Sequence, residues 1–409
     1  HAKAIILANE LKNMGCEQLN DFFFDTIRIK LPEGKSAMML REVAEANLVN
    51  FRYFEDGVIG ISTDELTSAE GVLKVLAIFA KVLELPVPST ILDVKETALP
   101  QELVRQSKAL NHEIFEKYHS ETEMMRYIKS LDRKDISLTQ SMISLGSCTM
   151  KLNAAAELLP LSWQEFTGIH PFAPEAQVQG YKELIANLEG YLSTITGFAG
   201  CTLQPSSGAA GEYTGLLTIR RYQQAQGQGH RNVVLIPASA HGTNPASAVQ
   251  AGFNVIVTAC DENGNVDVED IRAKAEQHKD DLAALMITYP STHGIFEPAI
   301  REICEIIHAN GGQVYMDGAN MNGQIGLTSP GFIGADVCHL NLHKSFASPH
   351  GGGGPGVGPI CVAAHLVEYL PSHNFINPEN PNTAVAASPW GSAGILPITY
   401  GYIRMMGAD

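Results

Sequence analysis

A lysine and an aspartate, both able to take part in covalent catalysis, each follow a hydrophobic stretch. Lys344 lies within VCHLNLHKSFASPHGGGGPGVGPICV, and Asp317 ends VYMD, 27 positions earlier. A lysine amine becomes a nucleophile when desolvation or a neighbouring cation disfavours its charged form. An aspartate in a pocket of low dielectric constant can hold a protonated ring nitrogen by ion pairing. Taken singly, a solvated lysine and a turn-capping aspartate fit these positions at least as well.

A third group that can bind a ligand lies in QPSSGAAG, where small residues precede a helical pattern. Backbone N–H groups of Ser207, Gly208 and Ala209, together with the helix dipole, would form a cradle for a phosphate. An ordinary helix N-cap explains the same residues equally well.

Two further side chains follow predicted strands. His241, in ASAHGTNPAS, could stack its flat ring on a planar cofactor, or it could be an ordinary capping histidine. Thr292, in TYPSTHG, could contact a cofactor oxygen, although Pro290 also predicts a simple turn there.

A metal site is the weaker interpretation of the two histidines near Lys344. His339 and His343 have the i, i+4 spacing that suits zinc on a helix. However, the residues around His339 form the pattern of a buried strand, and no carboxylate accompanies the pair as it does in HExxH. We therefore predict no metal.

The elements that must position these residues alternate along the second part of the chain. Strands are expected at 232–236, 254–259, 283–289, 313–316 and 337–342, separated by helices that include 209–226, 268–278 and 299–310. Such alternation predicts an α/β fold with a mostly parallel sheet covered by helices on both faces. Ligands of these sheets bind beyond the carboxyl ends of the strands.

The first part of the chain predicts a smaller α/β layer. Its pattern is helix, strand, helix, strand pair and helix up to Leu83, followed by a proline-punctuated stretch and a predicted helix at 102–131. We expect three regions: a small α/β domain at 1–85, a linker and helical segment at 86–142, and a large ligand-binding domain at 143–409.

Composition limits the classes of function. The chain of 409 residues is 45% hydrophobic and carries a net charge of −16, from 28 Lys and Arg against 44 Asp and Glu. A large core is therefore expected, whereas nucleic acid and anionic membranes are unlikely partners on electrostatic grounds. No apolar run would span a bilayer, so we expect a soluble protein. The seven cysteines form no CxxC pair, which favours buried thiols in a reducing compartment.

Together, a lysine, an aspartate, a phosphate cradle and a flat ring match the needs of pyridoxal 5'-phosphate. The motifs that carry them closely resemble those of the P-protein (glycine decarboxylase) family of the glycine cleavage system: SCTMKLN, QPSSGAAGEYTGLLTIR, ASAHGTNPASA, TYPSTHG, VYMDGANMNGQIGL and LNLHKSFASPHGGGGPGVGPI. The resemblance implies an aminotransferase-like large domain of the PLP fold type I. It also implies that 1–85 is the small domain of a preceding, non-catalytic half, and that the second half's own small domain is missing.

The resemblance implies a role for each site residue. Lys344 would form the aldimine with the cofactor, Asp317 would pair with the pyridinium and His241 would stack on the ring. The phosphate would be bound by Ser207, Gly208, Ala209 and His343. Ser147 and Thr149 would recognise the glycine carboxylate, with Cys148 between them a buried thiol.

The resemblance also implies a reaction and its partners. The enzyme would be a glycine dehydrogenase (aminomethyl-transferring) that decarboxylates glycine and passes the aminomethyl group to the lipoyl arm of H-protein. Gly351–Gly354 would gate that arm or form a tight crossing beside the cofactor, and Ala387–Gly394 would complete a neighbouring site in a homodimer or pseudo-dimer. The location would be the cytoplasm in a bacterium or the mitochondrial matrix in a eukaryote. The alternatives are another enzyme of the fold, an aminotransferase or aldolase, or a noncatalytic scaffold half.

Overall fold

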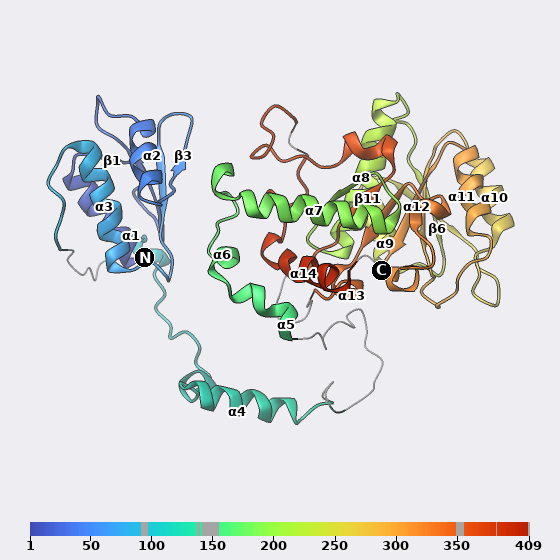
Figure 1. Ribbon diagram of the computed structural model, residues 1–409, viewed down its shortest axis with the longest axis horizontal. Coiled ribbons are helices and arrows are strands. Elements are labelled where there is room, and N and C mark those ends of the chain that lie inside the picture. The colour runs from blue at the N-terminus through green and yellow to red at the C-terminus, as the bar shows by residue number, and fades with distance from the viewer. Residues whose placement is uncertain (91–96, 137–139, 141–154, 349–355, 382, 408–409) are drawn as a thin grey trace. The chain divides into compact units, whose positions relative to one another are not determined.

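The chain divides into two compact units, His1–Asp135 and Ile136–Asp409. A computed structural model describes residues 1–90, 97–136, 140, 155–348, 356–381 and 383–407 (Figure 1). Each unit has its own hydrophobic core. Among the described residues, no helix has both the length and the apolar character needed to cross a membrane.

The first unit packs three helices against a four-stranded antiparallel sheet of order β1-β2-β4-β3. Strand β2 shows the alternation of a sheet with one buried face, because Ile27 and Ile29 are buried whereas Thr26, Arg28 and Lys30 are exposed. This arrangement agrees with the pattern in the sequence. The elements are α1 (Ala2–Asn13), β1 (Glu17–Gln18), β2 (Thr26–Lys30), α2 (Ala37–Ala46), β3 (Arg52–Tyr53), β4 (Ile59–Ser62) and α3 (Ala69–Leu83).

The helix predicted at 102–131 is wrong over its first part. The α-helix α4 covers only Glu121–Asp132, and the residues before it contain two short 3-10 turns, at Gln101–Leu103 and Glu113–Glu116. Ser120 starts α4 with a capping box that involves Glu123. Leu110 has a left-handed backbone with φ of 53°, which a continuous helix cannot contain. The cap at Ser120 therefore sets the start of α4, and the left-handed backbone at Leu110 interrupts the helical pattern that the sequence shows before it.

The second unit contains a seven-stranded sheet of order β5-β11-β10-β9-β8-β6-β7. Strands β10, β9, β8, β6 and β7 pair in parallel, as predicted, whereas β11 runs antiparallel between β10 and β5. The strands are β5 (Gly200–Thr202), β6 (Val233–Pro237), β7 (Asn254–Thr258), β8 (Leu282–Thr288), β9 (Gln313–Gly318), β10 (Val337–Leu340) and β11 (Ile360–Val362).

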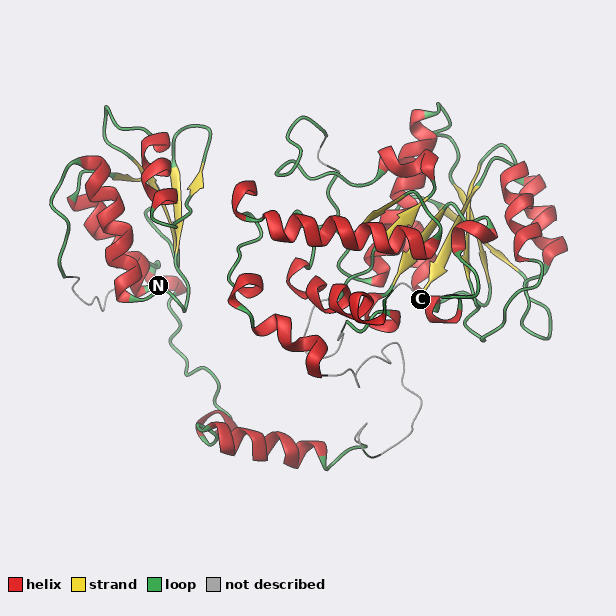
Figure 2. Ribbon diagram, in the orientation of Figure 1, coloured by secondary structure: helices red, strands yellow, loops and turns green. Residues whose placement is uncertain are grey.

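Helices cover both faces of this sheet (Figure 2). The α-helices are α5 (Ala155–Leu158), α6 (Gln164–Thr167), α7 (Gln179–Thr196), α8 (Gly208–Ala225), α9 (Thr243–Gln250), α10 (Val268–Gln277), α11 (Ile300–Ala309), α12 (Pro330–Ile333), α13 (Leu342–Ser345) and α14 (Leu396–Met406). Strand β8 shows the two layers clearly: Leu285 and Ile287 pack with α7, α10 and α11, whereas Met286 packs with α8 and α9. The α/β fold with a mostly parallel, helix-covered sheet is confirmed.

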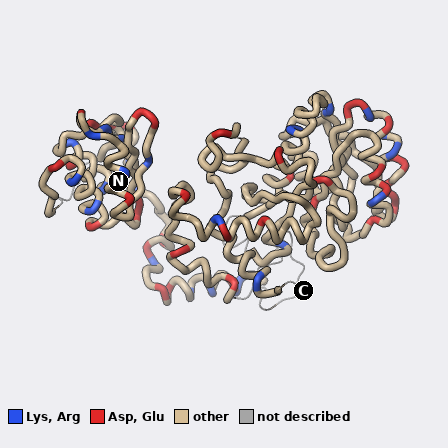
Figure 3. The backbone as a smooth tube through the Cα atoms, turned by 45° about the horizontal axis from the view of Figure 1, so that its top comes forward, with Lys and Arg blue, Asp and Glu red and all other residues tan. Residues whose placement is uncertain are grey.

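Residues of both charge signs occur on the outer helices α10 and α11, at the right of the view in Figure 3. Arg272 of α10 pairs with Glu302 of α11, and Lys274 pairs with Asp270 one turn away. These exposed or partly exposed pairs contribute little to stability and form a solvated face.

At the amino edge of the sheet, a buried carboxylate joins a strand to a helix. Asp336 accepts hydrogen bonds from the Val314 backbone N–H at 2.7 Å and from His308 Nε2 at 2.7 Å. The hydrogen bond that His308 donates to Asp336 raises the pKa of His308, against an opposing effect of burial. The charged form of His308 is therefore favoured in the folded state.

We expect this pair to make stability depend on pH. Because the pKa of His308 is higher in the folded state than in the unfolded state, its contribution is complete below the ordinary imidazole pKa of about 6.5 and is lost as the pH rises through the folded value. His308→Gln should therefore cost at most about 1 kcal/mol at acidic pH, since the imidazole is partly solvated, and less at alkaline pH.

Urea unfolding of the His308→Gln variant and the unmodified protein, at one pH below and one above the range in which His308 titrates, measures this difference in stability. In an Asp336→Asn background, His308→Gln should lose its pH dependence, because the same pair is already broken. A cost that grows with rising pH would contradict the assignment.

Candidate active site

Asp317 lies near the carboxyl end of β9, in register with His339 on the parallel strand β10. Its side chain is buried, with the residue only 2% exposed. Oδ1 accepts a hydrogen bond from the Ala319 backbone N–H at 2.9 Å and lies 3.5 Å from Nε2 of His339. The fold therefore provides an ordered, buried carboxylate at the edge of the sheet where ligands of such folds bind.

Lys344 lies on the short helix α13, which begins two residues after β10 ends. The side chain is partly buried, whereas His343 and Ser345 beside it are buried. The Asn322 backbone N–H, in the loop after β9, donates to Ser345 Oγ at 3.1 Å. The loops that follow β9 and β10 are thus joined, which places Lys344 at the same sheet edge as Asp317.

The start of α8 packs against the residues around α13. Ser207 caps the helix by accepting a hydrogen bond from the Ala210 N–H at 3.0 Å. A Cβ atom built on Gly208 would lie 2.6 Å from Oδ1 of Asn341, and one on Gly358 would lie 2.0 Å from the Ser207 carbonyl oxygen. At Gly358 the neighbour is main chain, so glycine is required there, whereas at Gly208 the neighbour is the side chain of Asn341. The predicted phosphate cradle and Lys344 therefore lie in adjacent segments.

His343 also lies beside this helix start. A Cβ atom built on Gly356 would be 3.7 Å from the Ser207 Cα and 3.9 Å from Nδ1 of His343. Ala209 is exposed, as a residue open to a ligand must be. The structure thus gathers Ser207, Gly208, Ala209 and His343 around one helix N-terminus.

His241 follows β6 and is exposed. Its Nδ1 lies 2.7 Å from Thr243 Oγ1, and Thr243 Oγ1 in turn donates to Glu212 Oε1 at 2.7 Å. The ring is thereby tied to α8, the helix whose first residues form the phosphate cradle.

Thr292 follows β8 and is exposed, but its hydroxyl donates to the Ser239 carbonyl oxygen. The single hydroxyl proton therefore joins the loops after β8 and β6, and the lone pairs of the oxygen remain for a ligand. Ser147, Thr149 and Gly351–Gly354 lie outside the described residues.

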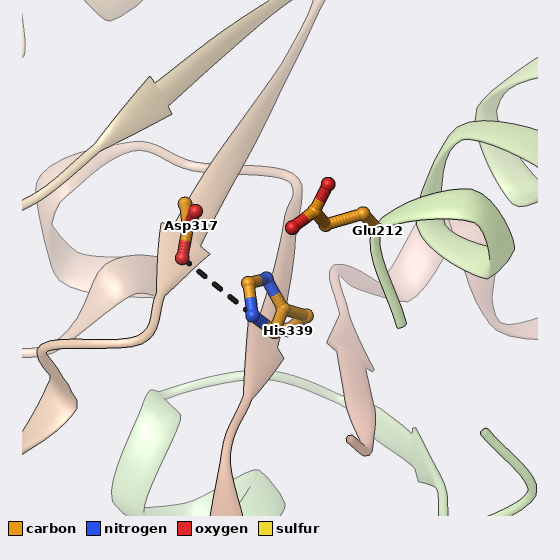
Figure 4. A group of neighbouring side chains, drawn as sticks. All are labelled: Glu212, Asp317 and His339. Carbon is orange, nitrogen blue, oxygen red and sulfur yellow. Dashed lines mark ion pairs between the residues drawn. The ribbon is translucent and has the colours of Figure 1, made fainter. Parts of the chain in front are cut away.

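A buried polar cluster that the sequence did not predict lies near these residues. Glu212, Asp317 and His339 each place a nitrogen or oxygen atom within 4.8 Å of the others (Figure 4). In the part of the chain that the structure describes, His343 does not belong to this cluster. Glu212 carried no strand-end signal, because it lies inside a helix.

Three polar groups surround the ring of His339. The Tyr315 hydroxyl lies 2.6 Å from Nδ1, and the side-chain amide nitrogen of Asn341 lies 3.3 Å from Nε2. Nε2 also lies 3.5 Å from Oδ1 of Asp317. Burial raises the pKa of the Tyr315 hydroxyl well above its ordinary value, and the negative charges of Glu212 and Asp317 add to that shift. Tyr315 therefore stays protonated, and the ring of His339 is held by contacts to both of its nitrogens.

The segment Ala387–Gly394 packs against the loop that leads into α8. Gln204 Oε1 accepts from the Val385 N–H at 2.6 Å, and Gln204 Nε2 donates to the Pro389 carbonyl oxygen at 3.5 Å. Trp390 and its neighbours line a cavity of about 430 Å³ together with Phe166 and Tyr181. Its predicted contribution to a neighbouring site stays a prediction.

Comparisons with known proteins identify the family. The family model described as glycine cleavage system P-protein matches residues 1–79 and 81–374. The glycine dehydrogenase (decarboxylating) of Bacteroides fragilis (strain YCH46) is 63% identical over 417 residues, and the mitochondrial enzyme of Dictyostelium discoideum is 54% identical over 420 residues. Each match covers 100% of this chain but only 43% and 42%, respectively, of the relative's length.

Solved structures show the same fold at low sequence identity. A glycine decarboxylase (P-protein) of the glycine cleavage system, in inhibitor-bound form, matches with a TM-score of 0.59 at 16% identity and covers 76% of this chain and 71% of that one. A sphingosine-1-phosphate lyase from Burkholderia pseudomallei matches with a TM-score of 0.52 at 16% identity, covering 72% and 70%. On the family model and the identity across its whole length, the chain belongs to the glycine cleavage system P-protein family.

Proposed function

We propose that this chain carries the pyridoxal phosphate site of a glycine decarboxylase. The main support for the proposal is that Lys344, the buried Asp317 and the start of α8 all lie at one edge of the sheet. Membership of the P-protein family supports it, as do relatives named glycine dehydrogenase (decarboxylating). Because the chain spans less than half the length of these relatives, the activity of the whole enzyme is part of the proposal.

The donor set suits this cofactor. Asp317 offers a buried negative charge for a protonated ring nitrogen, and the first turn of α8 offers N–H groups for a phosphate. Lys344 offers an amine for covalent attachment, and His241 offers an exposed flat ring. When bound, pyridoxal phosphate supplies an electron-withdrawing ring that accepts the electron pair left by departing carbon dioxide.

Each residue of the chain then has a defined task. Asp317, held by the Ala319 N–H and faced by His339, keeps a proton on the ring nitrogen. The Lys344 amine would hold the cofactor covalently and could take or return a proton at its Nζ. His241 covers one face of the ring, and Ser207, Gly208, Ala209 and His343 hold the phosphate. Thr292 completes the predicted cofactor contacts.

Glycine is the proposed substrate, and the lipoyl arm of H-protein is the proposed acceptor of the aminomethyl group. Ser147 and Thr149 would bind the glycine carboxylate, and Gly351–Gly354 would admit the arm. Other components of the glycine cleavage system, and a homodimer or pseudo-dimer with the first half, complete the proposed assembly.

Isotope exchange tests the function. An enzyme of the relatives' full length that contains this chain, loaded with cofactor, should exchange labelled bicarbonate into the glycine carboxyl group, and lipoylated H-protein should stimulate the exchange. Transamination or aldol cleavage without this exchange would instead indicate another enzyme of the fold. Failure to retain any cofactor would indicate a noncatalytic half.

A further inference from the structure

Glu212 is a buried carboxylate to which the proposed function gives no role. It lies in α8 and is 4% exposed. Oε1 accepts a hydrogen bond from Thr243 Oγ1 at 2.7 Å, and Oε2 accepts one from Ser247 Oγ at 2.8 Å. Both hydroxyl groups come from α9. Each oxygen of the carboxylate therefore accepts a hydrogen bond from a different hydroxyl group, which fixes the position of the side chain.

Thr243 connects this carboxylate to His241. A threonine hydroxyl has one proton to donate, and here that proton goes to Glu212. The oxygen therefore presents a lone pair to Nδ1 of His241 at 2.7 Å. Two lone pairs at this distance would repel each other, whereas a proton on Nδ1 makes the contact a hydrogen bond. The short contact thus requires protonated Nδ1.

A competing contact favours the opposite tautomer. The backbone N–H of Thr243 lies 3.2 Å from the same Nδ1 and would donate to it if the nitrogen were unprotonated. This contact is longer than the one to Thr243 Oγ1, and it is not supported by a charged group. The carboxylate of Glu212 therefore decides which contact is made.

We propose that Glu212 is a positioning residue that acts through Thr243 to fix the ring of His241 with Nδ1 protonated and a lone pair on Nε2. The hydrogen bond to Thr243 also orients the ring of His241, because an exposed imidazole would otherwise sample several rotamers. Asp317 and His339 lie beside Glu212, so the same cluster orients the groups proposed for the ring nitrogen and for the ring face (Figure 4). This inference rests on the proposed function in one respect, namely that His241 covers a bound cofactor.

Nitrogen NMR of the full chain with ¹⁵N-labelled histidine tests the tautomer directly. Measured without cofactor, at a pH about two units above the ordinary imidazole pKa of about 6.5, the signals of His241 should show a proton on Nδ1. His241→Gln identifies these signals by their loss. A proton on Nε2 in the unmodified chain would overturn the proposal.

Matched substitutions on α8 and α9 test the path. Thr243→Val removes the acceptor and leaves the backbone N–H, so the proton should move to Nε2, whereas Thr243→Ser should keep it on Nδ1. Glu212→Ala should also move it to Nε2, because the Thr243 hydroxyl can then donate to Nδ1. Ser247→Ala removes the other hydrogen bond to Glu212 and should leave the tautomer unchanged. An unchanged tautomer in folded Thr243→Val and Glu212→Ala would also overturn the proposal.

Cofactor binding gives a second measurement. Loss of one hydrogen bond that orients His241 should raise the dissociation constant of pyridoxal phosphate about tenfold in Thr243→Val and change it less than about twofold in Thr243→Ser. Equal affinities in the two variants would contradict the positioning role. The two proposals can fail separately. If the tautomer behaves as expected but the unmodified protein retains no cofactor, the proposed function is wrong, whereas the hydrogen-bond path from Glu212 through Thr243 to His241 is still supported.

Discussion

Replacement of Lys344 by alanine is expected to abolish covalent retention of pyridoxal phosphate and to lower the glycine exchange rate at least about 10³-fold. The physical reason is the loss of the amine that α13 places at the same sheet edge as Asp317 and the start of α8. Borohydride reduction followed by peptide mapping measures the first effect, and labelled bicarbonate exchange in the full-length enzyme measures the second.

Two controls make this result specific. Lys279→Ala removes an exposed lysine just before β8, at the amino end of that strand, and should change neither measurement. A small primary amine in the buffer should restore part of the activity of Lys344→Ala, because it can enter the space left by the side chain. Full activity of Lys344→Ala, or trapping of the cofactor on a different lysine of the unmodified enzyme, would refute the assignment.

The strand-end position of functional residues was the strongest signal in the sequence. Asp317 and Lys344 were found because each follows an apolar run, and the alternation of helices and strands predicts that the carboxyl ends of parallel strands share one edge. The strand before Lys344 ends at Leu340, two residues earlier than predicted, and Lys344 lies on the short helix α13 that follows it. The local sequence pattern was therefore sufficient to predict the functional residues that directly follow a strand at the carboxyl edge of the sheet.

Glu212 could not be found by the same reasoning. Its hydrogen-bond partners Thr243 and Ser247 lie 31 and 35 positions along the chain and on another helix. No local period records which helices of an α/β layer lie side by side. His339 was noticed only as a possible metal ligand, because its contacts to Tyr315 and Asp317 depend on the register between β9 and β10.

The short strands β5 and β11 were missed for a related reason. Each has only three residues, which is too short for a periodic pattern. They are held by pairing with each other and, for β11, with β10. Tertiary pairing rather than local preference creates both strands.

Asp317→Asn is expected to lower the exchange rate about 10²- to 10³-fold while leaving the fold intact. Asparagine has nearly the same shape and can still accept the Ala319 N–H, but it lacks the negative charge that holds a proton on the ring nitrogen. The cofactor should still attach to Lys344, because that chemistry uses the amine. The effect should therefore fall on the turnover rate at saturating glycine more than on cofactor content.

Asp336→Asn is the matched control, because it removes a buried carboxylate from the opposite edge of the same sheet. Asp336 accepts hydrogen bonds from Val314 and His308, so its replacement should lower the free energy of unfolding. The exchange rate per folded, cofactor-loaded molecule should nevertheless be unchanged. If the two variants lose activity equally, the charge of Asp317 has no special role at the ring nitrogen. If only Asp317→Asn loses turnover, the effect comes from where the charge lies rather than from general damage to the sheet.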